Sequence, residues 1–586
     1  MTLRIPALLS LLLLTACTNA PPATSAGKPP ADDNDWHHGA MVSAANPDAV
    51  AAAIAVLKDG GHAVDAAIAA HAVLGLVEPE SSGIGGSAFM LVYDRASNTT
   101  TVYDGRETAP AAASPDMFTV NGQPLGGREK WSTGVSVGVP GAVALYHAAH
   151  AAHGRSEWSA VLQPAIELAS NGFEVTGKFL VYNQALEPAM ATGAFPNAAD
   201  YLFPDGVAHS AGDVIANPDY AATLQRIADE GPSAFYEGEI AAAIVDRAQA
   251  APVGSPMTLD DVANFEVAER DAVCGAFRDM KICSVPPPSS GIAHIMIPTL
   301  YDTLLTGEEA TVEEKIAVFV DAQRLAYADR DHFVGDPDFV DVPVQFLIDP
   351  GYIEQRATER FAPSDVPVHG DPFFVVSEAE AAWNWAADAT IEAAGTSHLS
   401  IIDSEGNAVA MTASVGYPWG SIRMTHGFFL NNQMTDFSGA ADDGTPVANA
   451  IAGGKRPRSS MSPTIIFDAD GEPMMLTGSA GGSSILAYTT KTILAVTDWE
   501  LSAQQATDFP NIVARGENVG VEVSAEGGQA IADDLIERGY NVQPGRGENS
   551  GLHIIVVGPS GLSGSADSRR HGTVESIPPS AASGSQ

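Results

Sequence analysis

The pattern of apolar and polar residues predicts two helices between residues 46 and 76 and mainly helical structure from residue 141 to about 390. Asn46-Pro47-Asp48 supplies a helix cap, a proline in the first turn and an acidic residue, and the apolar run that follows ends at Gly60. A second helix is predicted over 63–76. From residue 141 onward the helical pattern dominates, with Ala-rich stretches at 142–152 and 312–328.

Strand-like alternation replaces the helical pattern later in the chain. Residues 396–403 and 408–415 alternate, and 404–407 has the composition of a turn, so this region predicts a hairpin with one half-buried face. Earlier, the glycine-rich loop 80–86 leads into an apolar strand over 88–93. Further strands are predicted at 464–467, 474–477 and 553–557.

The N-terminal residues have the pattern of an export signal. Arg4 precedes an apolar run over 5–14 that is too short to span a bilayer, and small residues follow before Cys17. Leu14-Thr15-Ala16-Cys17 resembles a bacterial lipobox, in which the cysteine becomes the lipidated first residue. Ordinary cleavage nearby, with Cys17 incidental, is the alternative. In both cases residues 1–17 form a signal peptide, and we expect a periplasmic or cell-envelope protein.

Two stretches lack apolar periodicity. Residues 18–40 are rich in Pro, Ala, Ser and Asp, which is typical of a flexible tether. Residues 572–586 are expected to be a disordered tail.

The composition excludes some kinds of partner. Lys and Arg number 29 and Asp and Glu 72, which gives a formal charge of −43. Such a surface repels phosphate backbones, so nucleic acid is not expected as a partner. The length of 586 residues and the 45% hydrophobic content allow a large buried core.

Cys274 and Cys283 are the cysteines beyond the signal peptide. Gly275 and Asp279 between them suggest a hairpin that brings the two sulfurs together in an oxidising compartment. The two cysteines are therefore expected either to form a disulfide or to remain free thiols.

Several common catalytic patterns have little support in the sequence. It contains no HExxH and no paired CxxC, so no metal site is predicted. The glycines of 80–86 precede a strand and no Lys-Ser/Thr pair follows them, unlike a phosphate loop. Residues 134–138 match the G-x-S-x-G elbow of esterases around Ser136, but valines flank the serine and Pro140 delays the helix that the elbow needs.

A family resemblance begins at the predicted hairpin. Gly395-Thr396-Ser397-His398-Leu399-Ser400, followed by Asp403 and 406–409, resembles the junction where γ-glutamyltransferases cleave themselves into a large and a small subunit. Further blocks of that family occur in the family's order between about 41 and 571: 80–86, 105–110, 138–141, 286–291, 431–437, 455–464 and 477–483.

The resemblance implies an α+β fold of the N-terminal-nucleophile hydrolase type. This is a four-layer αββα sandwich formed jointly by a large subunit, 41–395, and a small subunit, 396–571. The implied reaction is ping-pong: Thr396 takes the γ-glutamyl group from glutathione or a related amide and passes it to water, an amino acid or a peptide. No cofactor is implied.

The nucleophile's chemistry agrees with that reading. A threonine hydroxyl needs an adjacent base, and cleavage would free the α-amino group of Thr396, whose reference pKa is about 7.7–8.0. The same hydroxyl, attacking the Gly395 carbonyl, would make the cut.

The remaining site residues follow from the resemblance. Ser414 stands where many members have a second threonine that supports the nucleophile, and Gly481 and Gly482 match the oxyanion hole. A γ-glutamyl group carries a carboxylate and an ammonium. The matching carboxylate contacts are Arg106, Ser459 and Ser460, and the matching ammonium contacts are Gln433 and Asp436.

The sequence departs from the family pattern at two places, and these departures allow more than one class of substrate. Gly416 stands where members often have Asn or Glu near the substrate ammonium, and 438–454 is shorter than a covering lid and contains no tyrosine. A cephalosporin or glutaryl acylase of the same fold needs no ammonium partner; Asp436 opposes that reading and Gly416 favours it. An inactive, unprocessed binding lipoprotein is a further alternative, which the intact Thr396, Gly481 and Gly482 oppose.

Overall fold

The computed structural model describes residues 36–307, 310–359, 361–373, 385–388, 390–439, 444–545 and 549–579. The described residues belong to one structural unit that begins at Trp36. The lipobox and residues 580–586 lie outside them, so lipidation at Cys17 and disorder at the C-terminal end stay predictions.

One sheet holds the predicted hairpin at its centre. It has seven strands in the order β22-β1-β11-β12-β2-β3-β8, and each neighbouring pair is antiparallel. The prediction of the hairpin is confirmed, with β11 and β12 within one residue of the expected bounds at each end. The strands are β1 (Ala40–Ala44), β2 (Ser87–Asp94), β3 (Thr99–Asp104), β8 (Ala268–Asp271), β11 (Gly395–Ile402), β12 (Ala408–Gly416) and β22 (Thr573–Ile577).

A second sheet packs against the first. Its order is β21-β20-β16-β15-β10-β9, and the three further strands predicted from the sequence are β15, β16 and β20. The sheets meet through buried side chains that include Phe89 and Leu91 from the first sheet and Ile465 and Leu476 from the second. The strands are β9 (Val273–Phe277), β10 (Met280–Ser284), β15 (Thr464–Phe467), β16 (Pro473–Thr477), β20 (His553–Gly558) and β21 (Gly561–Ala566).

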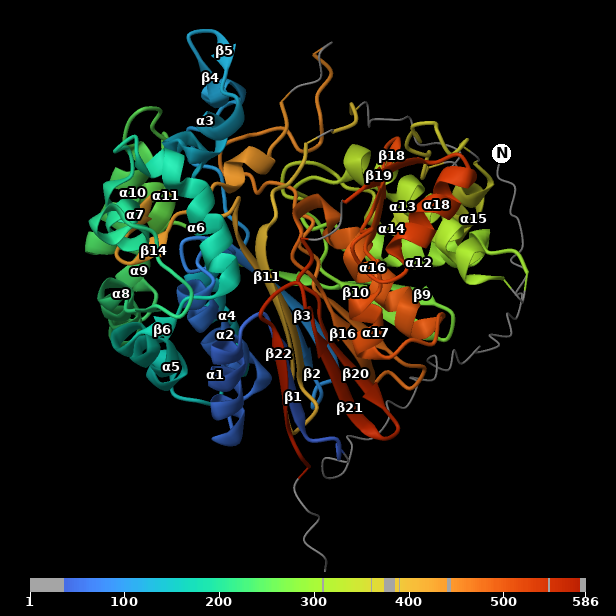
Figure 1. Cartoon of the computed structure of the whole chain (residues 1–586), viewed down its shortest axis with the longest axis horizontal. Coiled ribbons are helices and arrows are strands. Elements are labelled where there is room, and N and C mark those ends of the chain that lie inside the picture. The colour runs from blue at the N-terminus through green and yellow to red at the C-terminus, as the bar shows by residue number, and fades with distance from the viewer. Residues whose placement is uncertain are drawn as a thin grey trace, which may run out of the picture. The chain divides into compact units, whose positions relative to one another are not determined.

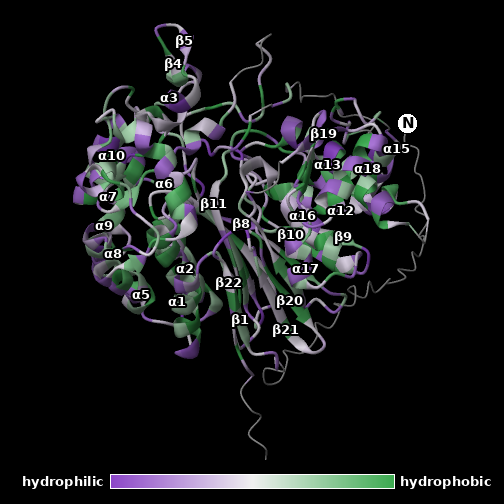
Figure 2. Cartoon of the chain, in the orientation of Figure 1, coloured by the Kyte–Doolittle hydropathy of each residue, from purple (hydrophilic) through white to green (hydrophobic). Residues whose placement is uncertain are grey.

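Helices cover the outer face of each sheet (Figure 1). On the first sheet these are α1 (Pro47–Lys58), α2 (Ala63–Val77) and α4 (Ala142–His153); on the second they are α12 (Ala293–Leu304), α16 (Ile485–Thr497) and α17 (Ala503–Asp508). The four layers confirm the predicted αββα sandwich. In Figure 2, β1 and β20 are largely hydrophobic, whereas the outer helices carry both kinds of residue.

Other elements surround the layers. The helices are α3 (Gly127–Ser132), α5 (Trp158–Asn171), α6 (Gly177–Met190), α7 (Pro196–Leu202), α8 (Pro218–Glu230), α9 (Ser233–Tyr236), α10 (Gly238–Gln249), α11 (Leu259–Ala263), α13 (Val312–Phe333), α14 (Val344–Leu347), α15 (Pro350–Thr358) and α18 (Gly528–Glu537). The short strands are β4 (Thr119–Val120), β5 (Gln123–Pro124), β6 (Phe173–Glu174), β7 (Val214–Ile215), β13 (Met424–Thr425), β14 (Phe428–Phe429), β17 (Ile512–Arg515), β18 (Asn518–Val521) and β19 (Asn541–Pro544).

The helix signals read from the sequence are also confirmed. Asn46 caps α1, because its side chain accepts a hydrogen bond from the Asp48 N–H. Helix α2 is buried along its whole length between the first sheet and outer helices, which agrees with its predominantly apolar sequence.

The expected disorder from residue 572 is wrong for Thr573–Ile577. These residues form β22, which pairs with β1 and places Val574 opposite Ser43. Strand β1 has β11 on its other side, so β22 supplies the partners for backbone groups that would otherwise be unpaired. The expected tether, 18–40, also extends too far, because Trp36 already packs against the core between the sheets and β1 begins at Ala40.

Cys274 and Cys283 form a disulfide. They lie directly opposite each other in the antiparallel β9–β10 hairpin, as the sequence suggested. Among the described residues, no helix is long and apolar enough to cross a membrane.

Candidate active site

Thr396 lies near the start of β11, between the two sheets. It is 2% exposed. Side chains alternate along a strand, so Thr396 shares its face with Ser400. The Ser400 hydroxyl donates to the His553 carbonyl of the second sheet at 2.9 Å. Gly395 and Thr396 are consecutive residues at the start of this strand.

The Ser414 hydroxyl contacts both sides of the Gly395–Thr396 bond. It accepts a hydrogen bond from Thr396 Oγ1 at 3.2 Å and donates one to the Gly395 carbonyl at 2.6 Å. The Gly416 N–H also donates to it, at 2.9 Å. A register shift between Gly395 and Thr396 places Ser414, and not Val415, opposite Thr396. The hydroxyl therefore orients Thr396 Oγ1 and polarises the adjacent carbonyl.

Gly481 and Gly482 adopt left-handed backbone conformations, with φ of 138° and 57°. Neither N–H donates a hydrogen bond to another group within the described part of the chain. A Cβ atom at residue 482 would lie 2.3 Å from the Glu392 carbonyl oxygen, so this turn packs against the segment before the Gly395–Thr396 bond. The geometry suits two backbone donors for an oxyanion.

Arg106 and Asp436 meet as a buried ion pair, with Nη2 2.6 Å from Oδ2. Arg106 follows β3, and Asp436 ends the 3₁₀ turn Gln433–Asp436. Burial raises the pKa of Asp436 to about 6, although the guanidinium of Arg106 acts in the opposite direction. Arg106 Nε and Nη2 also donate to the carbonyls of Pro457 and Arg458, both at 3.2 Å. Other groups of the protein therefore already accept hydrogen bonds from most of the nitrogen atoms of this guanidinium.

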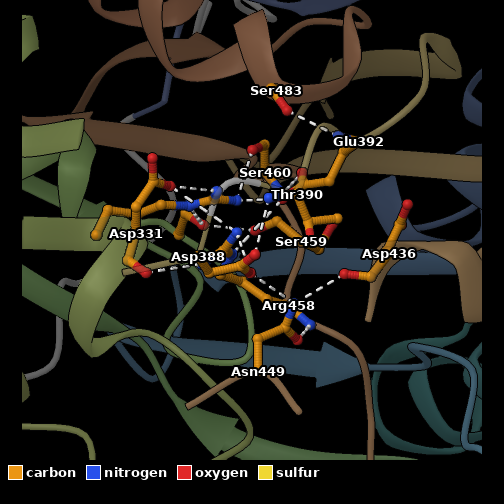
Figure 3. Close-up of polar contacts among 12 residues, drawn as sticks. Asp331, Asp388, Thr390, Glu392, Asp436, Asn449, Arg458, Ser459, Ser460 and Ser483 are labelled. Atoms are coloured by element: carbon orange, nitrogen blue, oxygen red, sulfur yellow. Dashed lines mark hydrogen bonds and ion pairs between the residues drawn. The ribbon is translucent and has the colours of Figure 1, made fainter. Parts of the chain in front are cut away.

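The other expected substrate contacts lie nearby. Ser459 and Ser460 sit beside Glu392 and Arg458 (Figure 3). The Ser460 N–H donates to a Glu392 carboxylate oxygen at 2.6 Å. Gln433 is buried, and its Nε2 has no hydrogen-bond partner among the described residues.

The packing around residue 416 requires a glycine, although members of the family often have Asn or Glu at this position. Its φ is 97°, and a Cβ atom there would lie 2.0 Å from Asn432 Oδ1. That oxygen accepts a hydrogen bond from the Tyr417 N–H at 2.9 Å. An Asn or Glu side chain at 416 has no room unless Asn432 moves.

A buried ionic contact upstream of Thr396 was missed by the sequence reasoning. Glu392 forms an ion pair with Arg330, and its Oε1 lies 3.7 Å from Arg458 Nε. Burial favours a higher pKa for Glu392, but the charges of the two guanidiniums and hydrogen bonding with Ser460 outweigh it and lower the pKa to about 2. Arg458 stands inside the block 455–464 that carries the family resemblance. Its partners come from distant segments, so the block alone gave no signal of the contact.

Ser136 is not a nucleophile elbow. It ends the 3₁₀ turn Gly134–Ser136, and its hydroxyl donates to the carbonyls of Thr133 at 2.7 Å and Trp131 at 3.0 Å. The turn does not follow a strand. This geometry contradicts the esterase reading.

His62, Asp94 and His153 bring ligand-type atoms within 4.8 Å of one another. The Nδ1 atom of His62 accepts a hydrogen bond from the Val64 N–H at 3.1 Å. In the neutral ring the proton is therefore on Nε2, which cannot then coordinate a metal. Asp94 ends β2, at the opposite end of that strand from Ser87, which pairs with Ser414.

Comparison with known proteins places this arrangement in a family. Residues 49–577 match the family described as Gamma-glutamyltranspeptidase. The chain is 33% identical over 521 residues to the glutathione hydrolase proenzyme of Bacillus subtilis (strain 168), which covers 87% of this chain and 86% of that protein. The crystal structure of cephalosporin acylase from Bacillus halodurans aligns with a TM-score of 0.80 at 25% identity, covering 95% of this chain and 98% of that one.

A second solved structure is also similar. Helicobacter pylori γ-glutamyltranspeptidase aligns at 30% identity with a TM-score of 0.52, covering 57% of this chain and 96% of that one. The family match spans every site residue described above and also includes β22. The chain belongs to the γ-glutamyltranspeptidase family.

Proposed function

We propose that this protein is a self-cleaving γ-glutamyltransferase and glutathione hydrolase with Thr396 as its nucleophile. The observation that carries the proposal is the Ser414 hydroxyl, which contacts both Thr396 Oγ1 and the Gly395 carbonyl. Family membership supports the reaction class.

Self-cleavage begins with attack of Thr396 Oγ1 on the Gly395 carbonyl carbon. The hydroxyl proton moves to the amide nitrogen of Thr396, the C–N bond breaks, and an ester joins Gly395 to Oγ1. Water hydrolyses this ester. The products are a carboxylate at Gly395 and a Thr396 that carries a free hydroxyl and a free α-amine.

Turnover uses the α-amine as the base. It accepts the hydroxyl proton as Oγ1 attacks the γ-carbonyl of the donor, and the proton then passes to the leaving amine. The N–H groups of Gly481 and Gly482 stabilise the oxyanion. Water or the amine of an acceptor then attacks the γ-glutamyl ester and regenerates Thr396.

Asp436 favours γ-glutamyl over simple glutaryl donors. Its buried carboxylate suits a substrate ammonium, which a glutaryl group lacks. The second candidate, an acylase, is favoured by Gly416, which presents no side chain to the ammonium, and by the likeness to a cephalosporin acylase. We infer γ-glutamyl specificity because Asp436, which pairs with Arg106, is also the expected carboxylate contact for an ammonium, and only a γ-glutamyl donor carries that ammonium.

A gel and an assay test the proposal. The purified protein should run as two fragments on a denaturing gel, and the smaller one should begin Thr-Ser-His-Leu. Thr396→Ala should give one intact band and no turnover. Activity on a γ-glutamyl anilide should exceed activity on the glutaryl anilide. An active protein that remains a single intact band would refute the proposal.

Export to the periplasm or cell envelope is a separate part of the proposal. It rests on residues 1–17, with lipidation at Cys17 as the further step. The Cys274–Cys283 disulfide supports it, because disulfides persist mainly in oxidising compartments. Mass spectrometry of the mature N-terminus would distinguish a lipidated Cys17 from an ordinary cleavage site.

A further inference from the structure

The imidazole of His398 is buried between the two sheets, close to Thr396 along β11. It is 1% exposed, and it lies two residues after Thr396, so the two side chains share one face of the strand. Burial, which is the largest cause, and the neighbouring His553 and His294 lower the pKa of His398 well below its ordinary value. The ring is therefore neutral near neutral pH.

Two hydroxyls hold this ring in one orientation. Nδ1 of His398 lies 2.9 Å from Thr412 Oγ1, and Nε2 lies 3.1 Å from Ser400 Oγ. The Ser400 hydroxyl donates its hydrogen to the His553 carbonyl, so it can only accept from the ring. Nε2 therefore carries the ring proton, and Nδ1 accepts from Thr412. The ring has no free lone pair with which to act as the base for Thr396.

The ring packs against Gly478, the residue that follows β16. A Cβ atom at residue 478 would lie 2.4 Å from Cε1, 2.5 Å from Nδ1 and 2.8 Å from Nε2 of His398. Ordinary contacts of a Cβ atom are 3.4–4 Å long, so only a glycine lets the end of β16 approach this ring. The backbone of Gly478 is not left-handed, so the lack of space, and not the backbone conformation, requires glycine here.

Gly478 begins the turn that carries the two proposed oxyanion donors. Gly481 and Gly482 follow it by three and four residues. The turn belongs to the second sheet, because it leaves β16, whereas His398 belongs to the first sheet. The ring therefore stands between the strand that carries the nucleophile and the turn that carries the donors.

Resting on the function proposed above, we infer that His398 is a positioning residue whose ring sets the distance between Thr396 Oγ1 and the N–H groups of Gly481 and Gly482. The ring can do so because it is planar and rigid and because two hydrogen bonds prevent it from turning. It takes no part in proton transfer. Oxyanion donors act only at about 2.7–3.1 Å from the oxygen, so the spacing of the two sheets at this point controls turnover.

Gly478→Ala tests the spacing from the side of the turn. The contact of 2.4 Å is about 1 Å shorter than an ordinary one, so the ring or the turn must move. In the cleaved protein, kcat for a γ-glutamyl anilide should fall about 100-fold. KM should change by less than about threefold, because the displaced groups act on the oxyanion and not on the bound donor. A wild-type kcat in this variant would overturn the inference.

His398→Ala tests the same contact from the other side. Removal of the ring should itself lower kcat by at least about tenfold. In that background the methyl group of Gly478→Ala meets no ring, so adding it should lower kcat by less than about a further threefold. A loss of about 100-fold in both backgrounds would show that the ring and the turn act independently, and it would refute the inference.

Gly275→Ala is the matched control for a crowded glycine. Its Cβ atom would lie 2.3 Å from Ile295 Cγ2, and residue 275 lies on β9, which β15 and β10 separate from β16 in the same sheet. It should lower the melting temperature about as much as Gly478→Ala and leave kcat within about threefold. Equal losses of kcat in the two variants would show a general effect of crowding and contradict the positioning role.

His398→Gln separates positioning from proton transfer. Glutamine is planar at its end and offers both a donor and an acceptor, so it can bond to Ser400 and Thr412. It should restore kcat to within about tenfold of wild type, and the pH profile of kcat should keep both of its limbs. A kcat no higher than that of His398→Ala, or a pH profile that loses a limb, would overturn the inference.

Failure of the proposed function and failure of this inference give different results. If the wild type neither cleaves nor turns over, the proposed function fails. If the wild type is active and the variants keep its kcat, only the inference fails. Thermal melts replace kinetics for any variant that stays uncleaved. The stability lost through Gly478→Ala should disappear in the His398→Ala background, and an equal loss in both backgrounds would refute the contact.

Discussion

Ser414→Ala should slow self-cleavage by about two to three orders of magnitude. The serine donates a 2.6 Å hydrogen bond to the Gly395 carbonyl oxygen, where negative charge develops as Thr396 attacks. The donor is preorganised, because its oxygen is held by the Gly416 N–H at 2.9 Å and by Thr396 Oγ1 at 3.2 Å. Removing one such donor costs about 2.7–4 kcal/mol of transition-state stabilisation, or roughly 100-fold to 1000-fold in rate.

The assay follows newly made protein. Pulse-labelled chain from cell-free synthesis is quenched at intervals, and the loss of the intact band gives the cleavage rate. Ser414→Thr retains the hydroxyl and should cleave within about tenfold of wild type. Ser414→Ala should also lose about 1–3 kcal/mol of stability, because the buried Gly416 N–H is left unpaired.

Ser400→Ala separates a chemical effect from a loss of stability. Ser400 is also buried on β11, and its hydroxyl also donates to a backbone carbonyl, but its contact is with His553 and not with Gly395. It should lower stability comparably and leave the cleavage rate within about threefold. The reasoning is refuted if Ser414→Ala cleaves at the wild-type rate, or if both alanine variants slow cleavage equally.

Three further predictions follow from single contacts. Gly416→Asn should lower the free energy of unfolding by about 2 kcal/mol or more, because the new Cβ atom would lie 2.0 Å from Asn432 Oδ1. For the same reason the substitution should not lower KM for γ-glutamyl donors. Thermal melts measure the first effect and steady-state kinetics the second. The ratio of kcat/KM for γ-glutamyl anilide to kcat/KM for glutaryl anilide should fall about tenfold per pH unit below pH 6. Asp436 has a pKa of about 6, and its protonation removes the negative charge that binds the substrate ammonium. A ratio that does not change with pH would show that Asp436 does not bind the ammonium. Replacing Cys274 and Cys283 by serine should lower the free energy of unfolding by about 2–3 kcal/mol in denaturant melts, because the unfolded chain is no longer cross-linked; an unchanged midpoint would contradict this.

Local patterns predicted much of the fold. The cap at Asn46 and the alternation along β11 and β12 involve residues close together in the chain, so their physical causes are visible in the sequence. Strand β22 was missed because its stability comes from pairing with β1, more than 500 residues away. A short, weakly apolar strand at an edge has no local signature of that kind.

The sequence alone indicated the αββα class through its family resemblance, and it predicted the cleavage junction and the two glycines suited to an oxyanion. It did so because ordered family blocks and glycine positions are linear features of the chain. Only the tertiary structure decided that Ser414 meets both Thr396 Oγ1 and the Gly395 carbonyl, since this depends on the register shift between β11 and β12. The same holds for Glu392 between Arg330 and Arg458, whose charges meet only when distant segments pack together.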